Sequence, residues 1–289
     1  MNVSIKNEHL VIDFSTKGAE LQSIKGTDSN INYMWRGDSA FWGKFSPILF
    51  PIVGALKENI YYYKDKKFSM SRHGFARDLA FEHHYLSDTE IMFKLVHNKE
   101  TLGIYPFEFE LIIRYELKGA SLSCTYEVHN PATEVLLFSI GGHPAFAAPL
   151  HNEGIYTDYY LQFNADEELT YNHIIDNLIS DQTATISLTN KELPLNHELF
   201  YNDALVFKKL KSNNIRLLNK KNYNGIEFSF DGFPYFGIWA AKDADFVCLE
   251  PWCGIADGIH HNQQFSAKEG VVHLDGGSTW KRSWKVCCF

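Results

Sequence analysis

The sequence contains no long apolar run: nothing in its 289 residues approaches the roughly 18 consecutive apolar side chains that a membrane-spanning helix needs. The amino terminus also lacks a basic start followed by an apolar segment, because polar and apolar residues alternate there from Val3 to Phe14. We therefore expect no signal peptide, no membrane partner and a cytoplasmic location.

Cysteines and positive charges are both few. The five cysteines are an odd number and show no C-x-x-C spacing, which favours reduced thiols over a disulfide framework. The formal net charge is -8, and no long run of lysine and arginine is present, so we expect no nucleic-acid partner. Individual arginines can still bind a small anion, and an anionic ligand therefore stays open.

Several sequence motifs of catalytic and metal sites are absent. The chain has neither a Gly-rich phosphate loop nor a G-x-S-x-G elbow. Its 13 histidines include the adjacent pairs His83-His84 and His260-His261. Neighbouring side chains of a strand point to opposite faces and cannot easily chelate one ion, although one histidine of the second pair could face a ligand from a loop. We expect no metal and no cofactor.

Helical patterns of ten or more residues are scarce, whereas short runs with a period of two are frequent. The best helix candidate is Lys99–Tyr105, which Pro106 stops. The strand candidates closed by turn residues include Val3–Phe14, Asn32–Trp35, Ile60–Lys64, Lys67–Met70, Ile91–Val96, Phe107–Leu117, Leu122–Val128, Tyr159–Phe163, Thr185–Leu188, Ala204–Phe207, Ile215–Leu218, Ile226–Phe230, Phe236–Trp239, Gly270–Leu274 and Trp280–Val286. We predict an all-β protein, with one large β-sandwich domain over residues 1–289.

Two apolar runs end in the same way, one on His143 and the other on Glu250, and a proline follows each at once. The proline ring pushes the preceding residue into an extended conformation. It also removes a donor from the strand ladder, so we expect regular pairing to stop there and both side chains to sit at the rim of a sheet. An acid and a base at two strand ends could then face each other across a cleft.

Each of these residues also fits a structural role. Alternation along the strand places Phe246, Cys248 and Glu250 on one face. A carboxylate that continues an apolar face is costly to bury unless it is paired, so Glu250 forms a structural ion pair or belongs to a site. His143 carries the same alternative, because a lone histidine near glycines is more often a satisfied core or turn residue.

A second histidine stands in a segment that turns at Gly74. The glycine permits a turn that a side chain would hinder, so His73 and Arg77 could project from one loop, although Arg77 could instead pair with Asp78. Upstream, the apolar run Ile48–Gly54 is interrupted by a proline. Taken alone, this run indicates an edge strand that packs on the core.

Five segments, taken together and in order, resemble the aldose 1-epimerase (galactose mutarotase-like) superfamily, within it the LacX-like branch near the hexose-6-phosphate epimerases. They are spread over most of the chain, which makes the set more specific than any one of them. The segments are Pro47–Gly54, His73–Asp78, Gly142–Phe146, Asp203–Phe207 and Leu249–Trp252. The resemblance implies a large β-sandwich with a shallow sugar cleft and a reaction that needs no cofactor.

The resemblance also implies roles for four residues. His143 would protonate the ring oxygen of a sugar, and Glu250 would take the proton from the anomeric hydroxyl. His73 would help to hold and polarise the ring oxygen, and Asp203 would hydrogen-bond sugar hydroxyls. Hemiacetal opening removes a proton at one oxygen and adds one at another, and the free pKa values of histidine and glutamate, about 6.5 and about 4.3, suit such roles near neutral pH.

The chain departs from the family pattern at the residues that would bind an anion. Ala55 stands where relatives commonly have an arginine, and Arg72 stands where they often have glutamine. Lys57, Arg72 and Arg77 are the candidates to supply the missing charge. These departures leave the proposed catalytic pair intact. The identity of the sugar, and whether it is phosphorylated, stays open.

We hypothesise an aldose 1-epimerase-like isomerase that interconverts the α and β anomers of a hexose or hexose phosphate. An alternative, favoured by Ala55, is a carbohydrate-binding or regulatory protein that keeps the cleft without turnover. In either case Phe146 and Trp252 could stack on a sugar. A third reading is a lyase-like or hydrolytic β-sandwich enzyme. The expected partner is a small sugar or sugar phosphate, and the sequence gives no indication of oligomeric state.

Overall fold

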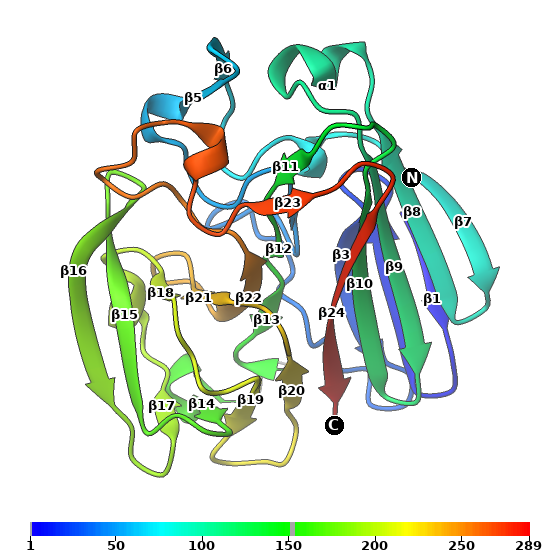
Figure 1. The fold of residues 1–289 in the computed structure, drawn as a ribbon. Coiled ribbons are helices and arrows are strands. Elements are labelled where there is room, and N and C mark those ends of the chain that lie inside the picture. Colours follow the sequence, from blue (N-terminus) through cyan, green and yellow to red (C-terminus); the bar gives the residue numbers. More distant parts are fainter. Residues whose placement is uncertain (1, 151–153) are drawn as a thin grey trace.

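The computed structural model describes residues 2–150 and 154–289 and is built almost entirely from antiparallel β-strands (Figure 1). One sheet has eight strands in the order β16, β15, β18, β21, β22, β12 and β4, with β13 also pairing with β22. Their bounds are Leu178–Ser187, Glu168–Ile175, Leu205–Phe207, Tyr235–Trp239, Phe246–Cys253, Ile140–Gly142 and Ile48–Leu49, and β13 is Ala145–Ala147.

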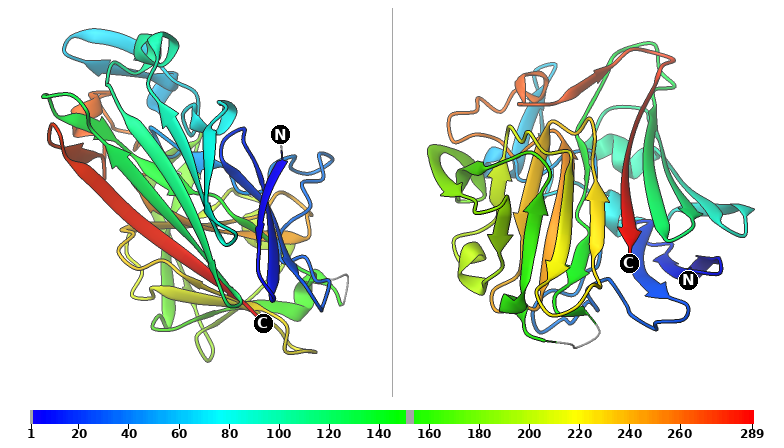
Figure 2. Two further views of the ribbon diagram at one scale, coloured as in Figure 1. Left: turned by 90° about the vertical axis from the view of Figure 1, so that its right-hand side faces the viewer. Right: turned by 90° about the horizontal axis from the view of Figure 1, so that it is seen from below.

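A second large sheet has nine strands in the order β17, β14, β19, β20, β24, β10, β9, β8 and β7. Their bounds are Glu192–Pro194, Tyr159–Phe163, Asn214–Asn219, Ile226–Ser229, Thr279–Cys288, Ser121–His129, Glu110–Lys118, Glu90–Val96 and Glu82–Ser87. Figure 2 shows β24, in red, running beside the green and cyan strands of this sheet.

Smaller elements complete the fold. A three-stranded sheet joins β1, β2 and β3, and two-stranded sheets join β5 to β6 and β11 to β23. These strands span Asn2–Lys6, Leu10–Ser15, Glu20–Gly26, Ile60–Tyr63, Lys66–Ser69, Leu136–Phe138 and Val272–Leu274. The α-helix α1 spans Lys99–Ile104, and short 3-10 helices cover Lys57–Asn59, Ala76–Asp78, Tyr156–Asp158, His197–Phe200 and Phe265–Ala267. No helix within the described ranges is long and apolar enough to cross a membrane.

The core follows from the period-two pattern of the long strands. In β9 the buried residues alternate with partly exposed ones, so that Leu111, Ile113, Tyr115 and Leu117 form one buried face. Strands β8 and β10 alternate in the same way, and their buried faces join an apolar core to which the eight-stranded sheet also contributes. The predicted all-β sandwich is confirmed.

Strand β22 corrects the expectation that pairing stops at the proline. All eight of its residues are buried, and it pairs with β21 through Glu250 and Pro251. On its other side β13 pairs with the first part of β22 and β12 with the last part, which leaves a gap between them. The Leu249 amide donates across this gap to the Pro144 carbonyl at 3.1 Å.

This gap explains why a proline is tolerated in a central strand. Amide groups two residues apart point to the same edge of a strand, so the nitrogen of Pro251, like that of Leu249, faces the gap. No ladder hydrogen bond is lost there. Glu250 therefore lies in the middle of a sheet and not at its rim.

Other local expectations can be compared directly. The helix at Lys99–Tyr105 is confirmed as α1, with Asn98 accepting two backbone N–H groups at its start. The edge-strand interpretation of Ile48–Gly54 is confirmed for β4, which ends the eight-stranded sheet. The strand expected at Asn32–Trp35 is wrong, because only isolated bridges form there.

Candidate active site

A cavity of about 310 Å³ opens over the eight-stranded sheet, a size in the range of about 300–1,000 Å³ that is usual for small-molecule sites. Its walls come from the loop after β4, the loop before the 3-10 helix at Ala76–Asp78, the β15–β16 hairpin and the central strands. The lining residues are Trp42, Val53, Gly54, Arg72, His73, Arg77, His143, Ile174, Asn177, Ile179, Ala204, Val206, Trp239, Glu250, Trp252 and Ala256. Six of the nine residues named from the sequence are among them.

His143 and Glu250 meet in this cavity although 107 positions separate them in the sequence. His143 stands in the gap between β12 and β13, directly beside the central strand that carries Glu250. Its Nδ1 lies 3.5 Å from Glu250 Oε1, and the two residues are 7% and 2% exposed. The indole of Trp42 stacks on the imidazole with ring centroids 4.8 Å apart.

Burial pushes both members of this pair toward their neutral forms. It raises the pKa of Glu250 well above its usual range, and the charge of Arg72 only partly opposes this. Burial, together with Arg72, lowers the pKa of His143 to about 3. A neutral imidazole beside a protonated carboxyl carries the same net charge as an imidazolium beside a carboxylate. One proton that crosses the contact therefore converts the neutral pair into an imidazolium beside a carboxylate.

His73 is held by reciprocal contacts with Gly54. Its amide donates to the Gly54 carbonyl at 2.8 Å, and the Gly54 amide donates to Nδ1 of the ring at 3.1 Å. The residue adopts a positive φ of 69°, followed by Gly74 at 72°, as a tight turn requires. This turn places the His73 ring 5.8 Å from the ring of His143.

Arg72 spans the cavity wall. Its Nε lies 3.1 Å from Nε2 of His73, and Nη1 donates to Asn177 Oδ1 at 3.0 Å. Burial, and then the charge of Arg72, lowers the pKa of His73 well below its ordinary value. A neutral imidazole accepts at one ring nitrogen only, so Gly54 and Arg72 cannot both donate to this ring at once. Arg77 supports Arg72 by donating to its carbonyl at 2.8 Å.

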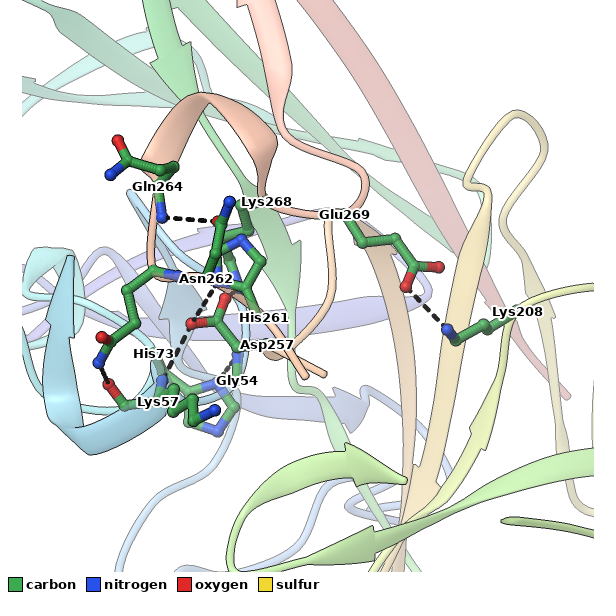
Figure 3. Close-up of polar contacts among 11 residues, drawn as sticks. Gly54, Lys57, His73, Lys208, Asp257, His261, Asn262, Gln264, Lys268 and Glu269 are labelled. Carbon is green, nitrogen blue, oxygen red and sulfur yellow. Dashed lines mark hydrogen bonds and ion pairs between the residues drawn. The ribbon is translucent and has the colours of Figure 1, made fainter. Parts of the chain in front are cut away.

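A buried ionic network stands behind the Gly54 loop (Figure 3). Asp257 accepts from the Lys57 amide at 2.9 Å and from Lys268 Nζ at 2.8 Å, and its own amide donates to the Ala55 carbonyl at 2.9 Å. Burial alone would raise the pKa of Asp257, but contacts with His261, Lys268 and the Lys57 amide outweigh it and lower the pKa to about 2.

The remaining three sequence candidates lie outside the cavity lining. Lys57 donates its Nζ to the Ile259 carbonyl at 2.9 Å, so its charge is directed away from the cavity. Asp203 adopts a positive φ of 92° and accepts from the Ala204 amide at 2.7 Å. It sits next to a lining residue, close enough for its charge to contribute to the raised pKa of Glu250.

Phe146 requires a correction. Its side chain is 0% exposed and packs against Phe228 in the core between the sheets, with ring centroids 5.7 Å apart. The residue belongs to β13, whose alternation directs this ring to the core, and it is removed from the candidate sugar contacts. Trp252 does line the cavity.

Sequence reasoning missed two tryptophans that line the cavity beside His143 and one polar residue of the cavity wall. Trp42 and Trp239 lie edge to face with centroids 5.5 Å apart beside His143, and Asn177 holds Arg72 from the β15–β16 turn. Trp42 stands in an irregular segment and has no periodic pattern around it. The Asp176-Asn177 dipeptide does have a local signal, because such pairs favour the positive φ values that the turn shows.

Comparison with known proteins settles the family. The model of the aldose 1-epimerase family matches residues 1–286. The chain belongs to the aldose 1-epimerase family. The resemblance inferred from the five sequence segments is therefore confirmed, and the cavity is that of a family member.

Individual relatives match over almost the whole chain. The chromosomal protein LacX of Lactococcus lactis subsp. lactis is 33% identical over 296 residues, covering 99% of both chains. A galactose mutarotase related enzyme from Lactobacillus acidophilus has a TM-score of 0.95 at 31% identity, over 100% of this chain and 97% of the other. A galactose mutarotase-like protein from Lactobacillus casei has a TM-score of 0.91 at 29% identity, covering 100% of both chains.

Proposed function

We propose that this member of the aldose 1-epimerase family interconverts the α and β anomers of a hexose or hexose phosphate. The observation that carries the proposal is the pairing of His143 with Glu250 at 3.5 Å inside a cavity of sugar size. The anomeric oxygen and the ring oxygen of an aldopyranose are bonded to the same carbon. An acid and a base that lie side by side can therefore reach both.

The reaction balances with one proton removed and one added. Glu250, as carboxylate, takes the proton of the anomeric hydroxyl while the bond between C1 and the ring oxygen breaks and a carbonyl forms at C1. His143, as imidazolium, delivers a proton to the ring oxygen. Rotation about the C1–C2 bond and the reverse steps give the other anomer, and the pair returns to its starting charge.

The other lining residues suit the binding of a polyol. A ligand oxygen that displaced Arg72 from His73 would receive an N–H from the neutral imidazole, because the Gly54 amide already occupies Nδ1. The indoles of Trp42 and Trp252 line the cavity and add apolar surface beside the sugar ring. Arg72 and Arg77 give the cavity positive charge, which favours an anionic sugar over a neutral one.

The test mixes freshly dissolved α-anomer with the protein and follows polarimetry or NMR exchange, for free and for 6-phosphorylated hexoses. We expect a rate above the buffer blank for at least one of them. No such rate with any sugar would exclude the epimerase function. Binding without exchange in the same NMR experiment would instead identify a carbohydrate-binding protein.

A further inference from the structure

Three metal-ligating side chains converge beneath the proposed sugar site. One ring nitrogen of His143, Sγ of Cys248 and a carboxylate oxygen of Glu250 all lie within 4.8 Å of one another. All three residues are buried, with Cys248 at 0% exposure and its thiol free. We propose that these three residues form a binding site for a zinc ion, in which zinc and the sugar compete for His143 and Glu250.

The spacing of the two cavity residues fits a zinc site. A tetrahedral zinc ion with bonds of about 2.1 Å holds an imidazole nitrogen and a carboxylate oxygen roughly 3.4 Å apart. His143 Nδ1 and Glu250 Oε1 are 3.5 Å apart. A zinc–sulfur bond of about 2.3 Å brings the thiolate roughly 3.6 Å from the other ligands, so side-chain rotation has to close the cluster by roughly 1 Å.

A second observation points to a ligand at the same place. His143 Nδ1 is buried, faces the carboxylate and has no hydrogen-bond partner among the residues that the structure describes. A buried ring nitrogen without a partner is rare in folded proteins. A metal ion would satisfy its lone pair.

The charge balance of the site also favours zinc. A dication bound by one thiolate, one carboxylate and a neutral imidazole gives a site with no net charge, which is the form that burial tolerates best. Sulfur and imidazole ligands select zinc over magnesium and calcium, which need several oxygens. Arg72 and Arg77 line the cavity and repel cations that are held by charge alone.

Access is through the cavity. His143 and Glu250 both line it, and Cys248 lies behind them on the same face of β22 as Glu250. A zinc ion held by these three residues would take a water or a substrate atom as its fourth ligand, and the cavity supplies the space for it. The competition with sugar rests on the proposed function, whereas the binding of zinc does not.

Titration calorimetry of chelator-treated protein with zinc chloride tests the site in the absence of sugar. We expect one tight site, weakened at least about 100-fold in Cys248→Ser, because even partners outside the ligand shell change metal affinity about 10–100-fold. Cys253→Ser is the matched control, a buried cysteine at the end of the same strand that is outside the cluster, and should bind as the parent does. Equal affinity in all three proteins, or no binding to the parent, would overturn the proposal.

Cobalt supplies a readout that identifies the sulfur ligand. Co²⁺ should give a thiolate-to-metal charge-transfer band in the parent and in Cys253→Ser but not in Cys248→Ser. Cys248→Ala serves as a second variant if the serine variant melts early. Zinc should slow anomer exchange in the parent and not in the Cys248 variant, each compared with itself without metal. If zinc binds and the anomer exchange rate stays unchanged, the competition is refuted. If the parent protein shows no anomer exchange at all, the calorimetry alone decides whether the zinc site exists.

Discussion

Asp257 and Lys268 form an ion pair in which both side chains are 0% exposed and Nζ lies 2.8 Å from Oδ1 (Figure 3). The pair fixes the loop that carries Gly54, because Asp257 also accepts from the Lys57 amide and donates to the Ala55 carbonyl. Gly54 in turn fixes His73. A buried charge pair outside the cavity lining thus determines where one wall of the site stands.

Removing one partner of this pair should be strongly destabilising. Lys268→Met leaves the Asp257 carboxylate buried without its main counter-charge, and we expect the free energy of unfolding to fall by about 3–5 kcal/mol. Urea denaturation measures this. Lys208→Met is the control: its Nζ lies at a similar distance, 2.7 Å, from the carboxylate of Glu269, but the side chains are 32% and 43% exposed. It should change stability by about 0–1 kcal/mol, and equal losses in the two variants would contradict the prediction.

Asp257 should also make stability depend on acid pH. Its folded pKa of about 2 lies below the unfolded value of about 3.9, so its contribution is present above the unfolded pKa and is lost as pH falls through the folded one. Integrated over that window, the contribution is about 2.6 kcal/mol. Urea curves between about pH 5 and pH 2 should show a shallower pH slope in Asp257→Asn than in the parent.

The control for this experiment is Asp181→Asn, because Asp181 is 77% exposed and its partner His260 is 79% exposed. It should keep the slope of the parent. If Asp257→Asn also keeps the pH slope of the parent, the buried network does not hold the carboxylate ionised.

Glu250→Gln separates a catalytic role from a structural ion pair. Burial keeps the carboxyl neutral in the empty site, so an amide of the same shape should leave the melting curve almost unchanged. The anomer exchange rate should fall by about 10²–10⁴-fold, because the proton acceptor is gone. Polarimetry and a thermal melt of the same sample decide the matter. A large loss of stability would instead support a structural ion pair with His143.

The sequence predicted the catalytic candidates better than their surroundings. His143 and Glu250 are marked locally by the prolines that follow them, and the family motifs strengthen that signal. Their placement at a sheet rim was wrong, because the strand gap that accommodates Pro251 depends on β12 and β13 meeting β22 at separate points. No local sequence pattern reveals that two strands will pair with separate parts of a third strand.

The missed and the misplaced residues share one cause. Phe146 follows the motif of His143, but the alternation of β13 directs its ring into the core. Trp42 and Asn177 come from segments distant in the sequence and reach the cavity only through tertiary packing. The charge of Lys57 was misplaced because its contact with Ile259 joins residues 202 positions apart.

Arg72 should distinguish phosphorylated from free hexoses. Loss of a charge-assisted hydrogen bond costs about 1.5–3 kcal/mol, so Arg72→Met should raise the KM for a hexose 6-phosphate by about 10–100-fold and that for the free hexose much less. Arg36→Met is the control, because Arg36 is 73% exposed and lies outside the cavity lining. Equal effects on the two sugars would mean that Arg72 does not bind the anion. Steady-state kinetics with both sugars gives the answer.

Gly237 should be required for the position of Trp252. A Cβ at Gly237 would lie 2.5 Å from two ring atoms of Trp252, so Gly237→Ala must push the indole toward the cavity. We expect a loss of about 1–3 kcal/mol of stability from overpacking, together with weaker sugar binding in an NMR titration.

Gly103→Ala is the matched control for Gly237→Ala, because a Cβ there meets nothing within 4 Å and the residue lies in α1. The helix position should gain about 0.5–1 kcal/mol, since alanine restricts the unfolded chain, and sugar affinity should stay unchanged. If Gly237→Ala binds sugar as the parent does, Trp252 contributes no face to the ligand and the aromatic contact has to come from Trp42.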